Sequence, residues 1–384
     1  MAATVGRRRP VRPVAVVSFA QSQMMRREEQ RNDVEMLQPV IVEVFEKIGL
    51  SKDEMGFVCS GSCDYLVGAP FSFVGALDAV GAWPPMRESH VEMDGAFALY
   101  EAWTQLQEDD IDTALVFSFG RSSMSELGRV LALQLDPYYM APLWPDPVAL
   151  AALQARALID SGRYGEKDFA TVAARSRRDA RNNPYAQVTG EQSAEELLGD
   201  DYVVAPLRRH ALPPITDGAT AVILAAGDRA RALCERPAWI TGMDHRIETH
   251  ALGARDLTTS PTTRRAAVGA GLLDGGGDGS PADGGGPNGG VRVEVAELHA
   301  PFAHQELILR DALGLGDAVA VNPSGGALAA NGVMVAGLVR IGEAAGRIMD
   351  GRAQTALAHA TSGPCLQQNL VCALAAAPGG DGRR

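Results

Sequence analysis

The 384-residue sequence predicts an α/β protein with a mostly parallel sheet that is covered by helices on both faces. Short, apolar, β-branched runs such as 14–19 and 113–119 alternate with segments of helical periodicity. A faint internal repeat adds to this, because a glycine, a helix and a Thr-Ala-Leu strand occur near Gly95 and again near Gly326. We therefore expect a duplicated α/β domain.

The first half of the chain shows the alternation clearly. Asp33 can cap a helix whose apolar positions recur at helical spacing until Gly49 ends it. The elements expected here are strands at 14–19, 57–60, 89–93 and 113–119 and helices from Asp33 and at 71–80 and 95–107.

The pattern changes between 120 and 202, which we interpret as an inserted loop domain. Two amphipathic helices are expected there, at Pro147–Asp160 and 166–182, beside a stretch rich in Pro, Tyr and Trp at 136–147. Further strands are then expected at 218–225, 239–243, 292–297, 318–321 and 355–361, with a long helix over 326–349. Nine glycines in the sixteen positions 275–290 indicate a disordered insertion.

The composition excludes several classes of protein. A formal charge of −12 without a dense basic stripe argues against nucleic acid as a partner. The apolar runs are far shorter than the roughly 20 residues that span a bilayer. Five cysteines form no disulfide framework, so we expect a reducing compartment, the cytoplasm. Residues 1–12 and 375–384 are expected to be tails.

The block Asn322-Pro-Ser-Gly-Gly follows an expected strand and precedes the expected long helix. A turn at this place directs backbone N–H groups over the sheet, and a helix N-terminus favours negative charge. Gly325 and Gly326 are therefore candidates for an oxyanion site, or for a tight turn that needs positive φ.

Four ordered motifs resemble those of thiolases. Asn322–Gly326 resembles their Asn-Pro-Ser-Gly-Gly segment, Thr216-Asp-Gly-Ala the end of their N-terminal half, and Glu297-Leu-His-Ala-Pro-Phe the Glu-Leu-His segment of the sterol-carrier-protein type. His90-Val-Glu-Met-Asp-Gly stands where thiolases carry their Cys-x-Ser-Gly elbow. The resemblance implies a duplicated, five-layer αβαβα thiolase fold. It implies an N-terminal half at 13–119 and 203–234, a loop domain at 120–202 and a C-terminal half at 235–374.

The departures from the thiolase pattern bear on the chemistry. The alignment puts Glu92 at the nucleophilic cysteine, Thr361 at the second cysteine and Asn331-Gly332-Val333 at the Gly-His-Pro segment, while His299 stands at the Asn or His that holds a catalytic water. Ordinary thiolase chemistry needs thiols at these positions and is therefore not expected.

The chain is more similar to the actinobacterial lipid-transfer-protein branch, whose members are often described as acetyl-CoA acetyltransferases. Some members cleave β-hydroxyacyl-CoA steroid side chains as retro-aldolases, together with a helper that carries a zinc ribbon and an OB fold. The resemblance thus implies coenzyme A as part of the substrate, no bound cofactor, a homodimer and such a helper.

Four side chains are candidates for acid–base work. His299 is the first, because an imidazole titrates near neutral pH. Glu92 and Asp94 lie two residues apart, and the pKa of one would rise if both approach the pocket. His359 could line the same pocket from the second half, while Gly325 and Gly363 could offer backbone donors to a thioester oxygen. Structural roles, such as helix capping for the two carboxylates, remain open.

Tyr138, Tyr139 and Trp144 in the loop domain and Asn322 are candidates for substrate contacts, although loop-domain core is the commoner role for such aromatics. The cluster Arg175, Arg177, Arg178 and Arg181 could bind CoA phosphates or simply form a solvated face. No metal site is predicted. Cys365 is the candidate for an atypical acyl-transfer cysteine. The open hypotheses are a retro-aldolase, an acyltransferase and a non-catalytic acyl-CoA-binding protein.

Overall fold

The computed structural model describes residues 11–81, 86–273 and 292–378. The predicted glycine-rich insertion and most of the predicted tails lie outside these ranges. Arg12 is an exception, because its guanidinium donates to the carbonyls of Leu106 (3.2 Å) and Ile111 (2.6 Å) and pairs with Asp112. The prediction of a free leader is therefore wrong at Arg12.

The main sheet has ten strands in the order β10-β9-β11-β12-β8-β1-β7-β4-β2-β3. The strands of the first half are β1 (Val14–Gln21), β2 (Phe57–Gly61), β3 (Arg87–Val91), β4 (Thr113–Gly120) and β7 (Gly218–Ala226). Those of the second half are β8 (Ala238–Ile247), β9 (Val295–Leu298), β10 (Ala320–Val321), β11 (Thr355–Ser362) and β12 (Gln368–Ala375).

Both halves have the same topology. Counted within its own half, each set of strands has the order 3-2-4-5-1, and the fifth strand runs antiparallel to both of its neighbours. The first strands, β1 and β8, join the halves through a short antiparallel ladder that pairs Val14 with Ile240. The predicted duplication is confirmed. The expectation of a mostly parallel sheet is wrong: β7 and β12 make four antiparallel pairings, and the ladder between β1 and β8 is a fifth among the nine pairings of the described strands.

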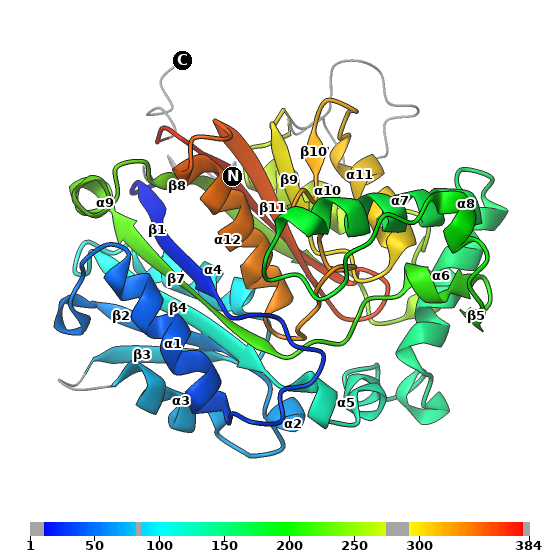
Figure 1. Ribbon diagram of the computed structural model, residues 1–384, viewed down its shortest axis with the longest axis horizontal. Helices are drawn as coiled ribbons and strands as arrows, with labels where there is room; N and C mark the ends of the chain where they lie inside the picture. The colour runs from blue at the N-terminus through cyan, green and yellow to red at the C-terminus, as the bar shows by residue number, and fades with distance from the viewer. Residues whose placement is uncertain (1–10, 82–85, 274–291, 379–384) are drawn as a thin grey trace, which may run out of the picture.

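The helices build layers on and between the two halves (Figure 1). They are α1 (Asp33–Glu46), α2 (Asp64–Val67), α3 (Ser72–Val80), α4 (Gly95–Gln105), α9 (Gly227–Leu233), α10 (Pro261–Gly269), α11 (Ala303–Leu313) and α12 (Ala336–Met349). Helices α4 and α12 share one core with the inner faces of both half-sheets. Helices α1 and α3 cover the outer face of the first half, and α10 and α11 that of the second.

Residue alternation along the strands produces this layering. In β4, Ala114 and Val116 face the central helices, whereas Leu115 and Phe117 face the outer core with α1. Because successive side chains point to opposite faces, a strand that is buried on both sides reads as a continuous apolar run. The five predicted layers therefore correspond to three packed cores.

Several predicted boundaries need correction. The long helix begins at Ala336 rather than near residue 326, and 326–335 are turns that include Met334 at φ 74°. Strand β3 ends at Val91, two residues earlier than expected, and β12 was not predicted. Most of the other elements lie within a few residues of their predicted positions.

The segment after β4 carries its own small elements. These are α5 (Leu127–Leu133), α6 (Pro147–Asp160), α7 (Glu166–Asp179), α8 (Ala194–Leu197), β5 (Tyr202–Val204) and β6 (Leu207–Arg208). Helices α6 and α7 pack into the outer core of the second half. The domain boundaries at 120, 202 and 235 remain predictions.

Candidate functional site

His299 immediately follows β9 and is held at both ring nitrogens. The backbone N–H of Thr361 donates to Nδ1 (3.4 Å), and Nε2 lies 3.2 Å from the Asn331 side-chain oxygen. Since Nδ1 accepts, Nε2 carries the proton, and the ring is neutral. Burial, together with the positive charge of Arg340, lowers the pKa of His299 to about 4. Near neutral pH this imidazole is therefore a hydrogen-bond donor at Nε2.

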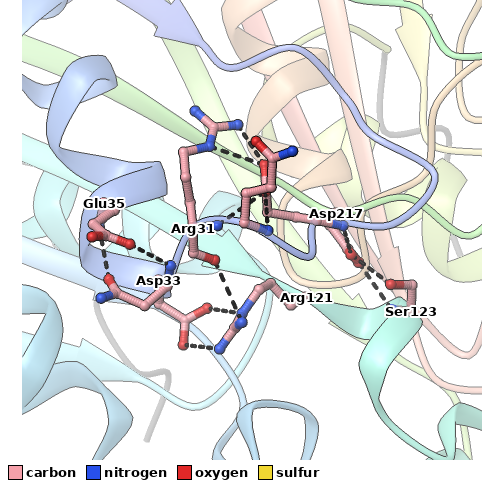
Figure 2. A network of polar contacts seen from close by, with 9 residues as sticks. Arg31, Asp33, Glu35, Arg121, Ser123 and Asp217 are labelled. Atoms are coloured by element: carbon pink, nitrogen blue, oxygen red, sulfur yellow. Dashed lines mark hydrogen bonds and ion pairs between the residues drawn. The ribbon is translucent and has the colours of Figure 1, made fainter.

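Asn331 owes its position to the first half of the chain. Its backbone carbonyl accepts the N–H of Thr216 (3.3 Å), which precedes Asp217 in the Asp-Gly-Ala motif. Asp217 is fully buried and accepts the N–H (2.9 Å) and hydroxyl (2.5 Å) of Ser123 and the N–H of Glu28 (2.8 Å). Figure 2 shows these contacts beside the ion pair of Arg121 with Asp33. The motif thus anchors the chain that presents Asn331 to His299.

His359 lies next to His299 but deeper in the sheet. It belongs to β11, is fully buried, and its Nε2 lies 3.0 Å from the Asn369 side-chain oxygen. The backbone N–H of His299 donates to its carbonyl (3.1 Å). Burial lowers the pKa of His359 to about 3, so this ring is neutral too. It supports the His299 backbone, and we propose no substrate contact for it.

Asp94 caps two helices at once. It accepts the N–H of Ala96 (2.8 Å) at the start of α4 and those of Gly337 (2.8 Å) and Leu338 (3.0 Å) at the start of α12. Burial raises the pKa of Asp94, whereas these three donors and the Arg340 charge oppose the rise. With its oxygens occupied by amides, Asp94 is placed to hold the two central helices together, not to move a substrate proton.

Glu92 is held in the turn after β3. Its Oε1 accepts the N–H of Asp64 (2.7 Å), and its Oε2 lies 3.1 Å from His90 Nε2. About 47% of the Glu92 side chain is exposed, so the carboxylate remains accessible. The two predicted carboxylates thus face different partners: Glu92 is open to solvent and Asp94 is buried.

The Asn322 side chain ties the turn after β10 to its surroundings. Its oxygen accepts the N–H of Leu298 (2.6 Å), and its amide donates to Glu306 (2.8 Å). The N–H of Gly325 donates to the Asn322 carbonyl (2.9 Å) and that of Gly326 to the Ser324 hydroxyl (3.3 Å). Both amides are therefore already used, which disfavours an oxyanion role for this turn.

Gly363 differs from these two glycines. It lies just after β11, is exposed, has φ 73°, and its N–H has no hydrogen-bond partner within the described ranges. At the neighbouring position Thr361, the hydroxyl donates to the Gln368 carbonyl (2.9 Å). Gly363 is the predicted backbone donor that remains available to a ligand.

The sequence reasoning missed a buried ion pair beside His299. Arg340 of α12 donates to Glu297 of β9 (2.9 Å) and to the Ser324 hydroxyl (2.6 Å), and both charged side chains are almost fully buried. Charged residues are rarely buried unless they are paired. The signal in the sequence that could have indicated this ion pair is that Glu297 and Arg340 each stand inside an apolar stretch.

The predicted loop residues lie on the surface. Tyr138 and Tyr139 are 82% and 74% exposed, and Trp144 is 51% exposed, so they are not loop-domain core. Arg175, Arg178 and Arg181 line a cavity of about 830 Å³ between α7 and α11, but each also contacts an acidic side chain: Glu306, Asp179 or Glu191. This pairing weakens the attraction of the cavity for phosphate.

The thiol of Cys365 is buried and donates to the Leu150 carbonyl (3.4 Å). Burial raises the pKa of this thiol to about 11, opposite to what a nucleophilic cysteine needs.

Within residues 11–81, 86–273 and 292–378, no group of three or more His, Cys, Asp and Glu side chains is arranged to hold a metal ion. Across the same ranges, no helix is both long and apolar enough to cross a bilayer.

Comparison with known proteins gives partial sequence matches, and no family model matches the chain. A 161-residue stretch is 32% identical to benzoylsuccinyl-CoA thiolase subunit BbsB of Thauera aromatica, covering 42% of this chain and 38% of that protein. A 92-residue stretch is 33% identical to 17-hydroxy-3-oxo-4-pregnene-20-carboxyl-CoA lyase of Mycobacterium tuberculosis, covering 24% of each. The chain thus spans less than half the length of these curated relatives.

Similarity to solved structures covers nearly the whole chain. The Ltp2-ChsH2(DUF35) aldolase has a TM-score of 0.74 at 17% identity, over 94% of this chain and 97% of that chain. Human mitochondrial 3-ketoacyl-CoA thiolase has a TM-score of 0.72 at 14% identity, over 95% and 98%. At such low identity these likenesses establish the fold and leave the reaction to be argued from the site.

Proposed function

We propose that the chain is a member of the thiolase superfamily, in its sterol-carrier-protein-type branch, and that it catalyses carbon–carbon bond chemistry on a CoA-linked lipid. The reaction that the site favours is retro-aldol cleavage of a β-hydroxyacyl-CoA, for example one that carries a steroid side chain. The products are a ketone or aldehyde and a shorter acyl-CoA.

One observation carries this proposal: His299 is a neutral donor, while Glu92 and Thr361 replace thiols at the two catalytic positions implied by the resemblance. Cleavage pushes an electron pair into a thioester enolate, whose oxygen needs hydrogen-bond donors. The candidate donors are the free N–H of Gly363 and the Nε2–H of His299, which would exchange its Asn331 acceptor for the enolate oxygen. An acyl–enzyme mechanism would need a nucleophile that these positions lack.

Glu92 is the carboxylate available to act as the base. It takes the proton of the β-hydroxyl group as the bond between the α and β carbons breaks, and the β carbon leaves as a carbonyl compound. The bond electrons form the enolate, and the proton on Glu92 then returns to the α carbon. Protons and electrons balance without a cofactor.

A helper subunit is part of the proposal. One structural neighbour is described as an aldolase formed with a DUF35 protein, and one relative as a thiolase subunit. We propose that this chain, as a homodimer, also works with a small partner that carries a zinc ribbon and an OB fold. The names of the relatives support a CoA substrate and a lyase or acyltransferase class.

Acyl transfer through Cys365 is the second candidate, and the burial of its thiol disfavours it. A third candidate is an acyl-CoA-binding protein without activity. Binding alone would raise the melting temperature with acyl-CoA but release no product.

The deciding experiment incubates the protein, with and without the helper, with a β-hydroxyacyl-CoA and detects the carbonyl product and the shortened acyl-CoA by mass spectrometry. We expect Glu92→Gln and His299→Ala each to lower the rate by at least about 100-fold. Cys365→Ala should leave it unchanged. Failure of the pair to release a carbonyl product from any β-hydroxyacyl-CoA tested would refute the proposal, and an acyl adduct that disappears in Cys365→Ala would establish acyl transfer instead.

A further inference from the structure

We infer that His90, held by Ser60 and Phe73, is the residue that positions Glu92 and stabilises its carboxylate during the reaction by donating a hydrogen bond from Nε2. This inference rests on the proposed function, because it gives the base of that reaction a partner. In the sequence His90 stands only as part of a motif, whereas in the structure it lies in the middle of a chain of hydrogen bonds that joins Ser60, His90 and Glu92.

The chain of contacts is continuous from the sheet to solvent. The Ser60 hydroxyl lies 2.9 Å from His90 Nδ1, and His90 Nε2 lies 3.1 Å from Glu92 Oε2. Ser60 is 2% exposed, whereas the Glu92 side chain is 47% exposed. The order of burial places the carboxylate at the accessible end, where a substrate hydroxyl can reach it.

The backbone enforces this arrangement. Strands β2 and β3 are parallel, and Ser60 is directly opposite His90 in the register. The imidazole stacks on Phe73 of α3 with centroids 4.7 Å apart and planes 14° apart. Because the carboxyl ends of parallel strands meet at one edge of a sheet, this edge is a common place for a catalytic group. The histidine is therefore held on three sides.

The surroundings of His90 contain other titratable groups. Asp64 faces it from the start of α2, but the Asp64 carboxylate already accepts the N–H groups of Phe71 (2.8 Å) and Ser72 (2.9 Å). Cys63 is buried next to Asp64, and burial raises the pKa of its thiol. Glu92 is thus the carboxylate in hydrogen-bond contact with the imidazole.

This arrangement keeps both ring nitrogens of His90 hydrogen-bonded whether the ring is neutral or charged. Nε2 faces only a carboxylate acceptor, so it carries a proton in either state. Nδ1 accepts from the Ser60 hydroxyl when the ring is neutral and donates to the same oxygen when the ring is charged, because the hydroxyl can rotate. Protonation of Glu92 by the substrate therefore leaves both hydrogen bonds of the His90 ring in place.

For the reaction, this means that the proton that Glu92 takes from the β-hydroxyl group stays near the α carbon to which it returns. Glu92 accepts the β-hydroxyl proton, and the adjacent imidazole stabilises either carboxylate state through the same hydrogen bond. The proton then returns to the enolate carbon, so no net proton is exchanged with solvent. His90 acts through Glu92 and is a positioning residue.

The first test measures kcat, KM and their pH dependence for the complex with helper and a β-hydroxyacyl-CoA. His90→Gln should lower kcat by about 10- to 100-fold with KM within threefold, and it should change the pH profile of kcat. Ser60→Ala, a smaller change that spares the ring, should lower kcat by about threefold to tenfold. His250→Gln is the matched control, since His250 is exposed and outside the chain of contacts. Wild-type kcat and pH profile in His90→Gln would overturn the inference.

A second readout does not depend on activity. Nitrogen-15 chemical shifts of the His90 ring, at a pH where it is neutral, should report the Nε2–H tautomer in the wild type and a tautomer mixture in Glu92→Ala. An Nδ1–H tautomer in the wild type would refute the proposed arrangement of hydrogen bonds around His90. If the tautomer is as expected but no substrate is cleaved, the proposed function fails while the His90–Glu92 pair stands, so the two failures are distinguishable.

Discussion

Acid should destabilise this protein in a window set mainly by three buried histidines, to which His210 adds an effect of the same sign because burial lowers its pKa too. Burial lowers the pKa of His299 to about 4 and those of His304 and His359 to about 3, from an ordinary value of 6.5. In this range these histidines are protonated in the unfolded chain but remain neutral in the native protein. The free energy of unfolding therefore falls as the pH drops from 6.5 towards 4. Above pH 7 these histidines are neutral in both the folded and the unfolded state, so the free energy of unfolding no longer changes with pH because of them.

The magnitude follows from the shifts. At pH 5.5 an unperturbed imidazole is about 90% protonated, and each of the three groups stays almost entirely neutral in the native state. Each then costs about 1.4 kcal/mol of unfolding free energy relative to pH 8, or about 4 kcal/mol for the three. Carboxylates with ordinary pKa values stay ionised between pH 5.5 and 8. Burial raises the pKa of Asp94 and of Glu297, so these two groups offset part of the histidine loss as the pH falls.

The assay is urea unfolding at half-unit steps from pH 8 to 5, in the wild type and in His304→Gln. His304 lies on α11 with Nε2 3.2 Å from Gln154, a contact that glutamine can retain. The variant should lose about one third of the pH dependence, whereas His250→Gln should lose almost none of it, because His250 is exposed. A urea midpoint that is flat from pH 7 to 5, or equal slopes in wild type and His304→Gln, would refute the reasoning.

Three further outcomes follow from the buried polar groups. Asp94→Ala leaves three backbone N–H groups without their acceptor and should cost about 3 to 5 kcal/mol, measured as a lower urea midpoint; a loss under about 1 kcal/mol would contradict the double cap. Arg340→Met leaves the Glu297 carboxylate buried and unpaired and should cost about 3 to 5 kcal/mol in the same assay, and Glu297→Gln combined with it should recover part of the loss. Native Cys365 should resist iodoacetamide at pH 8 and react once the protein is unfolded in urea, as peptide mass spectrometry can show; rapid labelling of the native protein would contradict its burial.

Much of the fold could be predicted because buried strands have a distinct pattern. The run at β4 is apolar on both faces and bounded by polar residues, and it was placed within one residue of its end. The antiparallel direction of β7 and β12 was missed, because a doubly buried strand looks the same in either direction. Strand direction depends on connections that local sequence does not encode.

The start of α12 was misplaced for a related reason. Residues 326–335 are mostly small and apolar, and the predicted helix continues through them although Asn331-Gly332 is a turn signal. Positive φ at Met334 ends this pattern, and the N–H of Gly95, from the other half of the chain, donates to the Met334 carbonyl (2.9 Å). The true helix start is capped by Asp94, 243 residues away. Such long-range caps leave no local signal.

The site shows the same limit. In the sequence Glu92 and Asp94 are equally good candidates for acid–base work. Only the structure shows that Glu92 is an exposed carboxylate and that Asp94 is a buried helix cap. The sequence allowed Tyr138 and Tyr139 to be loop-domain core or substrate contacts, and their exposure in the structure excludes the core role alone. Residue type predicts the chemistry that is available, whereas burial and partners decide which group uses it.

The carboxylate shared by α4 and α12 also bears on how the chain folds and evolves. During synthesis, Asp94 emerges long before residues 337 and 338, so α4 waits for its final anchor until the second half is nearly complete. Contacts of such sequence separation form late and slow the search for the native state. We therefore expect the duplicated halves to complete their folding together, and a chimera with a homologous half to need a carboxylate at position 94.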